Sequence, residues 1–349
     1  LSHLRRAVYA HLIAAESLTN QGRGKSVSMS ARDVDGDGRE EASLQTSAMG
    51  VVVDPEEGGA LTEWSLSRSR INLLDTLSRR YEPYHDKLKA KPLQAVPAGR
   101  QAAVSAGSVP SSIHEVLGVK EENLAAHLLY DDHRRSAFLD YALEGMPTLQ
   151  QVVSSTWGER RLWSAGPFRV GRQGRRHGAS QPLSVSMVRT IEGRSIRKTV
   201  RLTIARPALE CLYALEGLPV PVVGVEFNLS LRDERYLHQP GEQPLAAQFS
   251  IGEPAVGVSL TLSIDPPATV MHFPIETVSE SEEGLERTYQ GLCLVCLWAC
   301  HGSRRWTSRL RWVVTERSCR LPSRPSPSSI GRDCMPVRPR SSCSWRSGL

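Results

Sequence analysis

Alternation of apolar and polar residues at every second position most restricts how this 349-residue chain can fold. In the segment IRKTVRLTI, Ile196, Val200, Leu202 and Ile204 share one face, while arginine and threonine occupy the other. The segments LSVSMVRTI, VVGVEFNLSL and GVSLTLSI repeat the pattern. Strands with one apolar and one polar face, separated by Gly, Pro and Asp, are typical of antiparallel sheets packed as a sandwich. Strands do not alternate with helices, which argues against a doubly wound sheet or a barrel within these residues.

The first 25 residues follow a different period. Leu1, Leu4, Val8 and Leu12 recur at helical spacing, and Gly22 supplies a stop signal. This pattern predicts one amphipathic helix, which cannot form a core alone. Because the chain opens directly on this pattern and without Met, we expect that upstream sequence is missing.

Two segments depart from the strand pattern. Residues 86–112 are rich in Ala, Pro, Gly, Lys and Ser without periodicity, which predicts a long exposed or disordered loop. Residues 292–349 contain eleven Arg, no Lys and six of the seven Cys. An out-of-frame reading of a GC-rich gene produces such a composition, so we interpret 292–349 as a non-native tail. The expected organisation is therefore a helical segment 1–25, a β-sandwich domain 26–291, and this tail.

Within the tail, the spacing of Cys293, Cys296, Cys300 and His301 could hold zinc, although the non-native interpretation is favoured. The formal net charge of +6 also comes from the tail, since the first 291 residues are net acidic. We therefore expect no nucleic-acid partner. The longest apolar stretch, residues 292–299, is far shorter than the roughly 20 residues of a membrane helix, so no membrane partner is expected. A single cysteine before residue 292 favours a cytoplasmic chain that does not rely on disulfides.

The segment ARDVDGDGREE, residues 31–41, is the strongest candidate site. Carboxylates occupy every second position of a Gly-containing turn, and another closes the pattern D-x-D-x-D-G-x-x-[D/E]. Calcium prefers six to eight oxygen ligands, which predicts a structural calcium site without an open position for chemistry. Leu44 stands where an EF-hand needs its last carboxylate, and the alternative to a metal site is a solvated polar turn. The predicted ligands are Asp33, Asp35, Asp37, Glu41 and the backbone carbonyl of Arg39.

Several separate stretches carry a family resemblance: HLRRAVYAHLIAAE, DVDGDGREEASLQTSAMGVVVDPEEGGALTEWSL, LLDTLSRRYEPYH, SSIHEVLGVKEENLAAHLLYDDHRRSAFLDYAL and GVEFNLSL. Together they resemble the C-terminal half of glycoside hydrolase family 57, the α-amylase and 4-α-glucanotransferase family. The resemblance covers roughly residues 3–290. It implies a catalytic (β/α)7 barrel, then a helical bundle, then a β-supersandwich related to galactose mutarotase. The family's catalytic Glu and Asp lie in the barrel, so the resemblance implies that they precede this chain.

The resemblance and the strand pattern together predict a mainly β protein, an antiparallel β-supersandwich preceded by one residual bundle helix. The expected function is to support a retaining α-glucan-processing barrel and to contact α-1,4-glucan, with no activity in the fragment itself. The alternatives are a stand-alone carbohydrate-binding module and a basic-tailed interaction protein. No carboxylate here is expected to replace the catalytic pair, and the set considered includes Glu56, Glu57, Asp131, Asp132 and Asp140.

Glucan chains are usually held by aromatic faces and a few aligned polar groups. Trp157 and Trp163, which flank GERRL, are therefore candidate sugar contacts, and His114 is a third. Trp64 alternates with Leu66 and is expected in the core. The favoured role of the histidines in the polar stretches is to satisfy backbone groups in long loops, and the alternative is that they line a groove or complete the site of the neighbouring barrel: His85, His114 and His133.

Overall fold

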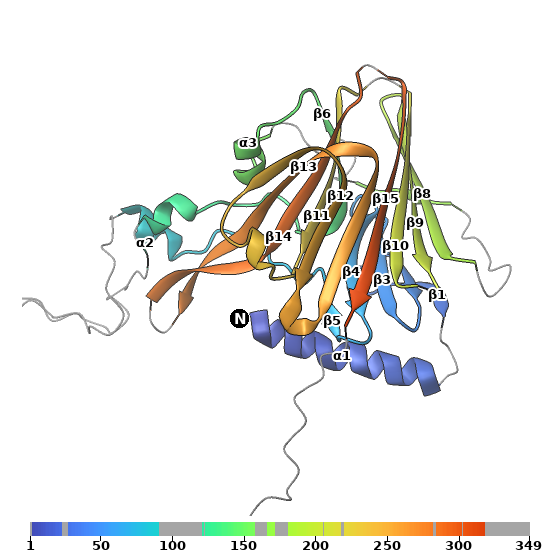
Figure 1. Cartoon of the computed structure of the whole chain (residues 1–349), viewed down its shortest axis with the longest axis horizontal. Helices are drawn as coiled ribbons and strands as arrows, with labels where there is room; N and C mark the ends of the chain where they lie inside the picture. The colour runs from blue at the N-terminus through green and yellow to red at the C-terminus, as the bar shows by residue number, and fades with distance from the viewer. Residues whose placement is uncertain are drawn as a thin grey trace, which may run out of the picture. The chain divides into compact units, whose positions relative to one another are not determined.

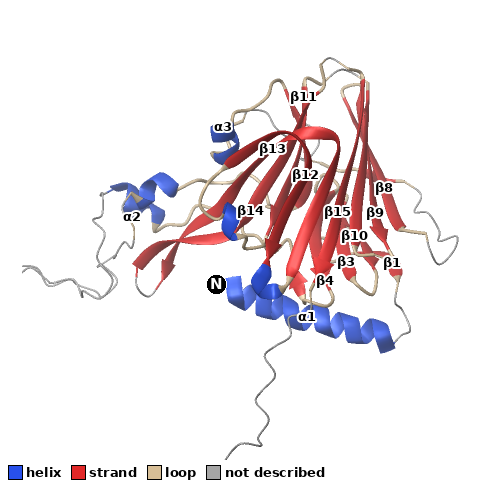
Figure 2. Ribbon diagram, in the orientation of Figure 1, coloured by secondary structure: helices blue, strands red, loops and turns tan. Residues whose placement is uncertain are grey.

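The computed structural model describes residues 2–22, 27–90, 121, 123–157, 166–171, 181–204, 206–217, 220–281, 284–301 and 303–317. Antiparallel strands dominate this part of the chain, and the predicted mainly β fold with one long helix is confirmed (Figures 1 and 2). None of the helices in these ranges is long and apolar enough to cross a membrane.

The elements are, in chain order, α1 (Ser2–Gly22), β1 (Ser28–Arg32), β2 (Glu41–Gln45), β3 (Met49–Asp54), β4 (Ala60–Leu66), β5 (Ile71–Asn72), α2 (His85–Ala90), the 3-10 helix η2 (Leu124–His127), β6 (Ala137–Leu143), α3 (Leu149–Val153), β7 (Arg169–Val170), β8 (Leu183–Ile191), β9 (Arg194–Thr203), β10 (Ala208–Glu216), β11 (Val222–Leu229), η3 (Glu234–Tyr236), β12 (Gly241–Glu253), η4 (Pro254–Val256), β13 (Val258–Ser281), β14 (Gly284–Ala299) and β15 (Arg305–Glu316).

The strands form one antiparallel sheet with the order β1-β2-β3-β4-β6-β11-β14-β13-β15-β10-β9-β8-β7. Strand β12 pairs with β13, and β5 pairs with β4. Strands from the two halves of this order pack face to face, since Trp64 of β4 meets Trp312 of β15 edge-on with ring centroids 6.1 Å apart. One apolar cluster takes side chains from both halves, including Val185, Met187 and Val200. The predicted period-two alternation therefore builds the interior of a sandwich.

The structure corrects the boundary predicted at residue 291. Strand β14 lies between β11 and β13, and β15 lies between β13 and β10. In β15, Trp306, Leu310 and Trp312 are buried, while Arg309 and Arg311 between them are exposed. A segment with this alternation belongs to the sandwich, so the interpretation of residues 292–317 as non-native is wrong. The rest of the predicted tail, 318–349, lies outside the described residues.

Strand β14 misled the sequence argument because it is buried on both faces. Residues 290–298 of the strand are all buried, with Cys293 in one apolar cluster and Cys296 in the other, so this part of β14 has no polar face and no alternation. Two cysteines on opposite faces of a strand cannot bind one ion, which also removes the zinc alternative. Both thiols are free and buried.

Helix α1 confirms the predicted amphipathic helix, but the apolar stripe that predicted it faces outward. Leu4, Val8 and Leu12 are 52%, 57% and 59% exposed, and Leu18 is 68% exposed. The buried apolar side chain of the helix is Ile13. The stripe is therefore exposed rather than packed against the sheet.

Two arginines attach α1 to the sandwich. Arg5 Nε donates to Asp75 Oδ1 at 2.8 Å, and Arg5 Nη2 donates to Gln290 Oε1 at 3.0 Å. Arg6 donates to both carboxylate oxygens of Glu253, at 2.6 and 2.7 Å. Bidentate contacts of this kind fix orientation as well as position, so α1 is held with its apolar stripe turned away from the sheet.

The predicted loop 86–112 is wrong at its start, because α2 occupies His85–Ala90. Its side chain Leu88 packs with Leu124, Val278 and Leu285 in a small apolar cluster. Residues 91–112 lie outside the described ranges.

Candidate functional site

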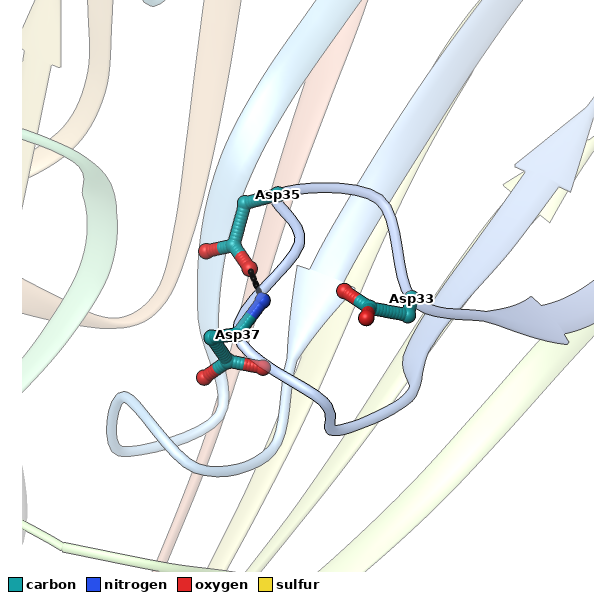
Figure 3. Close-up of side chains that lie close together, drawn as sticks. All are labelled: Asp33, Asp35 and Asp37. Carbon is teal, nitrogen blue, oxygen red and sulfur yellow. Dashed lines mark hydrogen bonds between the residues drawn. The ribbon is translucent and has the colours of Figure 1, made fainter.

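The acidic loop between β1 and β2 brings three predicted ligands together. Figure 3 shows Asp33, Asp35 and Asp37 around one tight turn. One oxygen of each can be chosen so that all three lie within 4.8 Å of one another, and all three residues are exposed. Gly36 and Gly38 have φ of 84° and 88°. These left-handed conformations favour glycine and allow the chain to curl around the carboxylates.

Backbone amides orient these carboxylates. Gly36 N–H and Gly38 N–H donate to the two oxygens of Asp33, at 2.7 and 3.0 Å. Asp37 N–H donates to Asp35 Oδ1 at 3.2 Å, and Arg39 N–H donates to Asp37 Oδ1 at 2.8 Å. The turn is thus shaped by its own side chains, while the remaining lone pairs are free to meet solvent or a cation.

The group of mutually close carboxylates does not include Glu41, and the side chain of Arg39 makes its contact elsewhere. Glu41 is buried and accepts the Val34 N–H at 2.5 Å. Burial raises the pKa of Glu41. The hydrogen bond from Val34 N–H opposes this rise, whereas the negative charge of nearby carboxylates, Asp35 first, adds to it. The Arg39 side chain leaves the loop for Glu56, with 2.8 Å between Nη1 and Oε2. Mutual repulsion of clustered carboxylates is relieved by a divalent cation, so the loop suits calcium, which stays a prediction.

Among the sugar-contact candidates, Trp157 is 7% exposed and packs against Tyr141 with ring centroids 4.7 Å apart. A ring buried in this way offers little surface to a sugar, so the structure does not favour Trp157 as a sugar contact. Trp163 and His114 lie outside the described residues. Trp64 is fully buried, as predicted.

The predicted role of histidines, to satisfy backbone groups, holds for His85 but not for His133. His85 meets backbone groups, since Nδ1 accepts the Glu82 N–H at 3.2 Å and Nε2 lies 3.1 Å from Val278 O, as predicted. His133 instead contacts side chains: Nε2 lies 3.2 Å from Glu226 Oε1, and Nδ1 lies 2.9 Å from Asp132 Oδ1. The predicted backbone role of His133 is wrong.

His133 belongs to a buried ionic network that sequence reasoning missed. Asp131 accepts from Arg79 Nη2 at 2.7 Å and from Arg135 Nη2 at 2.6 Å. The other arm of Arg135 donates to Glu226 at 2.9 Å. We call Arg79, Asp131, Arg135 and Glu226 the buried network; none of their side chains is more than 4% exposed.

Charge pairing dominates the protonation of this network. Burial alone would raise the pKa of Asp131, but Arg135 and Arg79 hold it well below its usual range. Burial would also raise the pKa of Glu226, whereas His133 and Arg135 hold it well below its usual range. Burial lowers the pKa of His133, but Glu226 outweighs this and raises it. The network is therefore charged at neutral pH.

A second buried ion pair spans the sandwich. Lys198 Nζ of β9 lies 2.5 Å from Asp140 Oδ2 of β6 and 2.7 Å from Phe138 O. It also donates to the turn before β4, at 2.9 Å from Gly58 O. Burial raises the pKa of Asp140 to about 6, and Lys198 opposes this rise. One signal was visible, because Lys198 falls on the apolar face of IRKTVRLTI.

These carboxylates are poor candidates for chemistry on a glucan. Asp131, Asp140 and Glu226 are each ion-paired with a buried cation. A general acid or nucleophile must reach the scissile bond. Buried and paired groups cannot do so, and their contacts join distant segments of the chain, which is a structural role.

The family can now be stated. The family model described as "Alpha-amylase/4-alpha-glucanotransferase, C-terminal" matches residues 33–310. The chain belongs to this family. The match runs from the acidic loop into β15, and so includes the strands that the sequence argument had assigned to a non-native tail.

The matches to known proteins cover most of this chain but less than half of each relative. Alpha-amylase 1 of Dictyoglomus thermophilum is 29% identical over 311 residues, covering 84% of this chain and 42% of the relative. The 4-alpha-glucanotransferase of Thermococcus kodakarensis is 29% identical over 313 residues, covering 89% of this chain and 44% of the relative. The crystal structure of 4-alpha-glucanotransferase from Thermococcus litoralis shares the fold, with a TM-score of 0.70 and 24% identity over 90% of this chain and 44% of that one. The chain spans less than half the length of these relatives.

Proposed function

We propose that this family member works as the C-terminal β-sandwich portion of a retaining α-glucan-processing enzyme, an α-amylase or a 4-α-glucanotransferase. In this role it supports a catalytic barrel that precedes it and contributes no catalytic residue. The similarity to both kinds of enzyme over less than half their length supports this role. Hydrolysis and transfer differ in how water reaches the barrel, so either activity is compatible with this portion.

The observation that carries the proposal is the exposed stripe of α1. Leu4, Val8 and Leu12 form a continuous apolar row on a helix that Arg5 and Arg6 hold against the sandwich. Apolar rows of this kind mark protein contacts. We infer that the stripe packs against the preceding part of the same polypeptide, which makes the sandwich a fixed support rather than a freely tethered module.

The reading frame upstream of Leu1 and the activity of two polypeptides test this role. The present chain should release no reducing sugar from amylose, whereas the polypeptide that includes the upstream frame should do so or redistribute maltoheptaose lengths. In the longer polypeptide, Val8→Asp should lower the melting temperature and glucan turnover together. Leu245→Asp, at a residue 80% exposed in β12, is the matched control. An upstream frame without a barrel, or glucan cleavage by the present chain, would overturn the proposal.

We also propose that calcium binds the loop of Asp33, Asp35 and Asp37 as a structural ion. The grouping of three carboxylates within 4.8 Å supports this, because a divalent cation relieves their mutual repulsion. The ion would join the segment after β1 to the start of β2, next to the helix that carries the exposed stripe. It would stabilise the entry to the sandwich and take no part in glycosyl transfer.

A further inference from the structure

A groove of about 570 Å³ lies between α1, the segment 74–84 and the strands β13 and β14. This size falls within the usual range of small-molecule sites, about 300–1,000 Å³. Trp157, the one described residue among the predicted sugar contacts, is not part of its lining. Its lining includes Arg5, Tyr9, Tyr84, Thr277, Thr288 and Gln290.

The two strands give the groove a row of hydroxyl and amide groups. Gln290 Nε2 donates to Thr277 Oγ1 at 2.8 Å. Ser279 Oγ and Thr288 Oγ1 lie 2.7 Å apart. These groups are donors and acceptors at once, and they repeat along paired strands β13 and β14, where Thr277 faces Thr288. Such a row can exchange hydrogen bonds with the hydroxyl groups of a sugar chain.

Much of the positive charge around the groove is neutralised by ion pairs, which favours a neutral ligand over an anion. Three of the four lining arginines are paired: Arg5 with Asp75 at 2.8 Å, Arg134 with Glu57 at 3.7 Å, and Arg135 with Asp131 at 2.6 Å and Glu226 at 2.9 Å. The fourth, Arg80, lies in the same lining as Glu82, which carries the opposite charge. Strong phosphate or carboxylate binding uses charge-assisted hydrogen bonds, and the paired guanidinium groups already spend theirs on protein carboxylates.

Two aromatic side chains complete the groove from different elements. Tyr9 belongs to α1, and Tyr84 belongs to the segment before α2; both are half-buried. Tyr84 is held in place, because its hydroxyl donates to Val278 O at 3.3 Å. Tyrosine offers an apolar ring face with a polar end, which suits the mixed surface of a pyranose.

Hydrogen bonds tie both walls of the groove to the sandwich. Arg79 anchors the segment 74–84 through two contacts with Asp131, from its backbone N–H at 2.7 Å and from Nη2 at 2.7 Å. Arg5 anchors α1 to Gln290 on the floor. A preformed site avoids the ordering cost of binding, so the buried network has a function in holding this groove open.

We propose that the groove binds a stretch of linear α-1,4-glucan, as an accessory contact separate from the catalytic barrel. The choice of glucan rests on the proposed function, while the neutral, hydroxyl-lined and aromatic character of the site comes from the groove itself. No covalent step is involved. The bound chain would be held on the sandwich side of the enzyme, close to the helix that meets the preceding domain.

Calorimetric titration of the present chain with maltoheptaose tests the groove. We expect saturable binding that Thr288→Val and Tyr84→Ala each weaken about tenfold, which corresponds to about 1.4 kcal/mol. Thr261→Val is the matched control, because Thr261 lies on β13 outside the groove and contacts Ser250. Melting temperatures of all variants separate a lost contact from a lost fold, and Thr288→Val preserves side-chain volume.

The outcomes are distinguishable. Absence of maltoheptaose binding by the unsubstituted chain would overturn the proposal that the groove binds glucan. Binding that is the same in Thr288→Val, Tyr84→Ala and the control would also overturn it. Competition by inorganic phosphate would show an anion site and would also overturn it. None of these results bears on the supporting role, which the upstream reading frame and the Val8→Asp polypeptide test separately.

Discussion

The acidic loop and the buried network both concentrate charge, but in opposite ways. The loop places Asp33, Asp35 and Asp37 within five residues of sequence, all exposed and of one sign. In the network, by contrast, Arg79 is 52 residues from Asp131, and Arg135 is 91 residues from Glu226. Exposed charges of one sign are tolerated because water and ions screen them. Buried charges are tolerated only when opposite charges meet them.

The difference has an energetic consequence. Removing one carboxylate from the loop reduces repulsion in water and leaves nothing buried without a partner. Removing one from the network leaves a guanidinium in the interior with too little negative charge around it. We therefore expect substitutions in the two regions to differ in the size of their effect on stability.

The largest effect should follow from Glu226→Gln. The amide keeps the shape but cannot balance Arg135 and His133, which lie 2.9 and 3.2 Å from the carboxylate. Loss of one partner of a buried pair costs about 3–5 kcal/mol in the free energy of unfolding. Urea titration at pH 7 measures it. Glu210→Gln is the control, since Glu210 pairs across an exposed face with Arg201 at 3.5 Å and should change stability by under about 1 kcal/mol. Equal losses in both variants would refute the distinction.

An intermediate effect should appear in the pH dependence of stability. The pKa of Asp140 is about 6 in the fold, above its ordinary value of 3.8, so the folded state binds more protons in this interval. Stability gained from Asp140 is complete below pH 4 and is lost as the pH rises through 6, by at most about 3 kcal/mol. Asp140→Asn should remove this loss in urea titrations from pH 4 to pH 7.

The network carboxylates should give the opposite slope. Because the pKa of Glu226 is lowered, its contribution is present above its unfolded pKa and is lost as the pH falls below about 4. In Glu226→Gln, the free energy of unfolding should therefore depend less on pH below about 4, while its decrease between pH 4 and 6 should remain. If Asp140→Asn instead removed the pH dependence below about 4, the pH intervals assigned to Asp140 and Glu226 would be wrong.

The smallest effect should come from the acidic loop and should depend on calcium. After chelation, calcium at ten to a hundred times its dissociation constant should stabilise the chain by about 1.4–2.7 kcal/mol. Asp35→Asn should remove this gain and have little effect in chelator. Glu242→Gln, at an exposed residue of β12, matches the charge change away from the loop. The calcium proposal would be refuted if titration calorimetry detected no heat and calcium left the melting temperature unchanged.

Sequence reasoning succeeded where neighbours along the chain decide the structure. The alternation of Val185, Met187, Val200 and Leu202 predicted buried faces of β8 and β9, and the structure buries all four. It failed for β14, because a strand covered on both faces has no alternation to detect. The long helix was also predicted, but the apolar residues that revealed it are exposed, since a period identifies a face and not what covers it.

The two candidate sites, the acidic loop and the groove, also differ in whether the sequence could reveal them. The acidic loop could be found because its carboxylates are close in sequence. The groove could not, since α1, the segment 74–84, β13 and β14 contribute separately and none has a distinctive motif. Trp157 was named as a candidate sugar contact from the charged residues that follow it, but its ring packs against Tyr141 of β6, which its neighbours in sequence do not reveal.

By itself, the sequence determined the β-rich class, the long helix, the acidic turn and the family, because each depends on local spacing or on motifs within single stretches. Only the tertiary structure decided that Lys198 meets Asp140, that Arg135 meets Glu226, and that the stripe of α1 faces outward. The physical reason is burial. The energy of a charge or an apolar side chain depends on what covers it, and the covering residues here lie dozens of positions away in the chain.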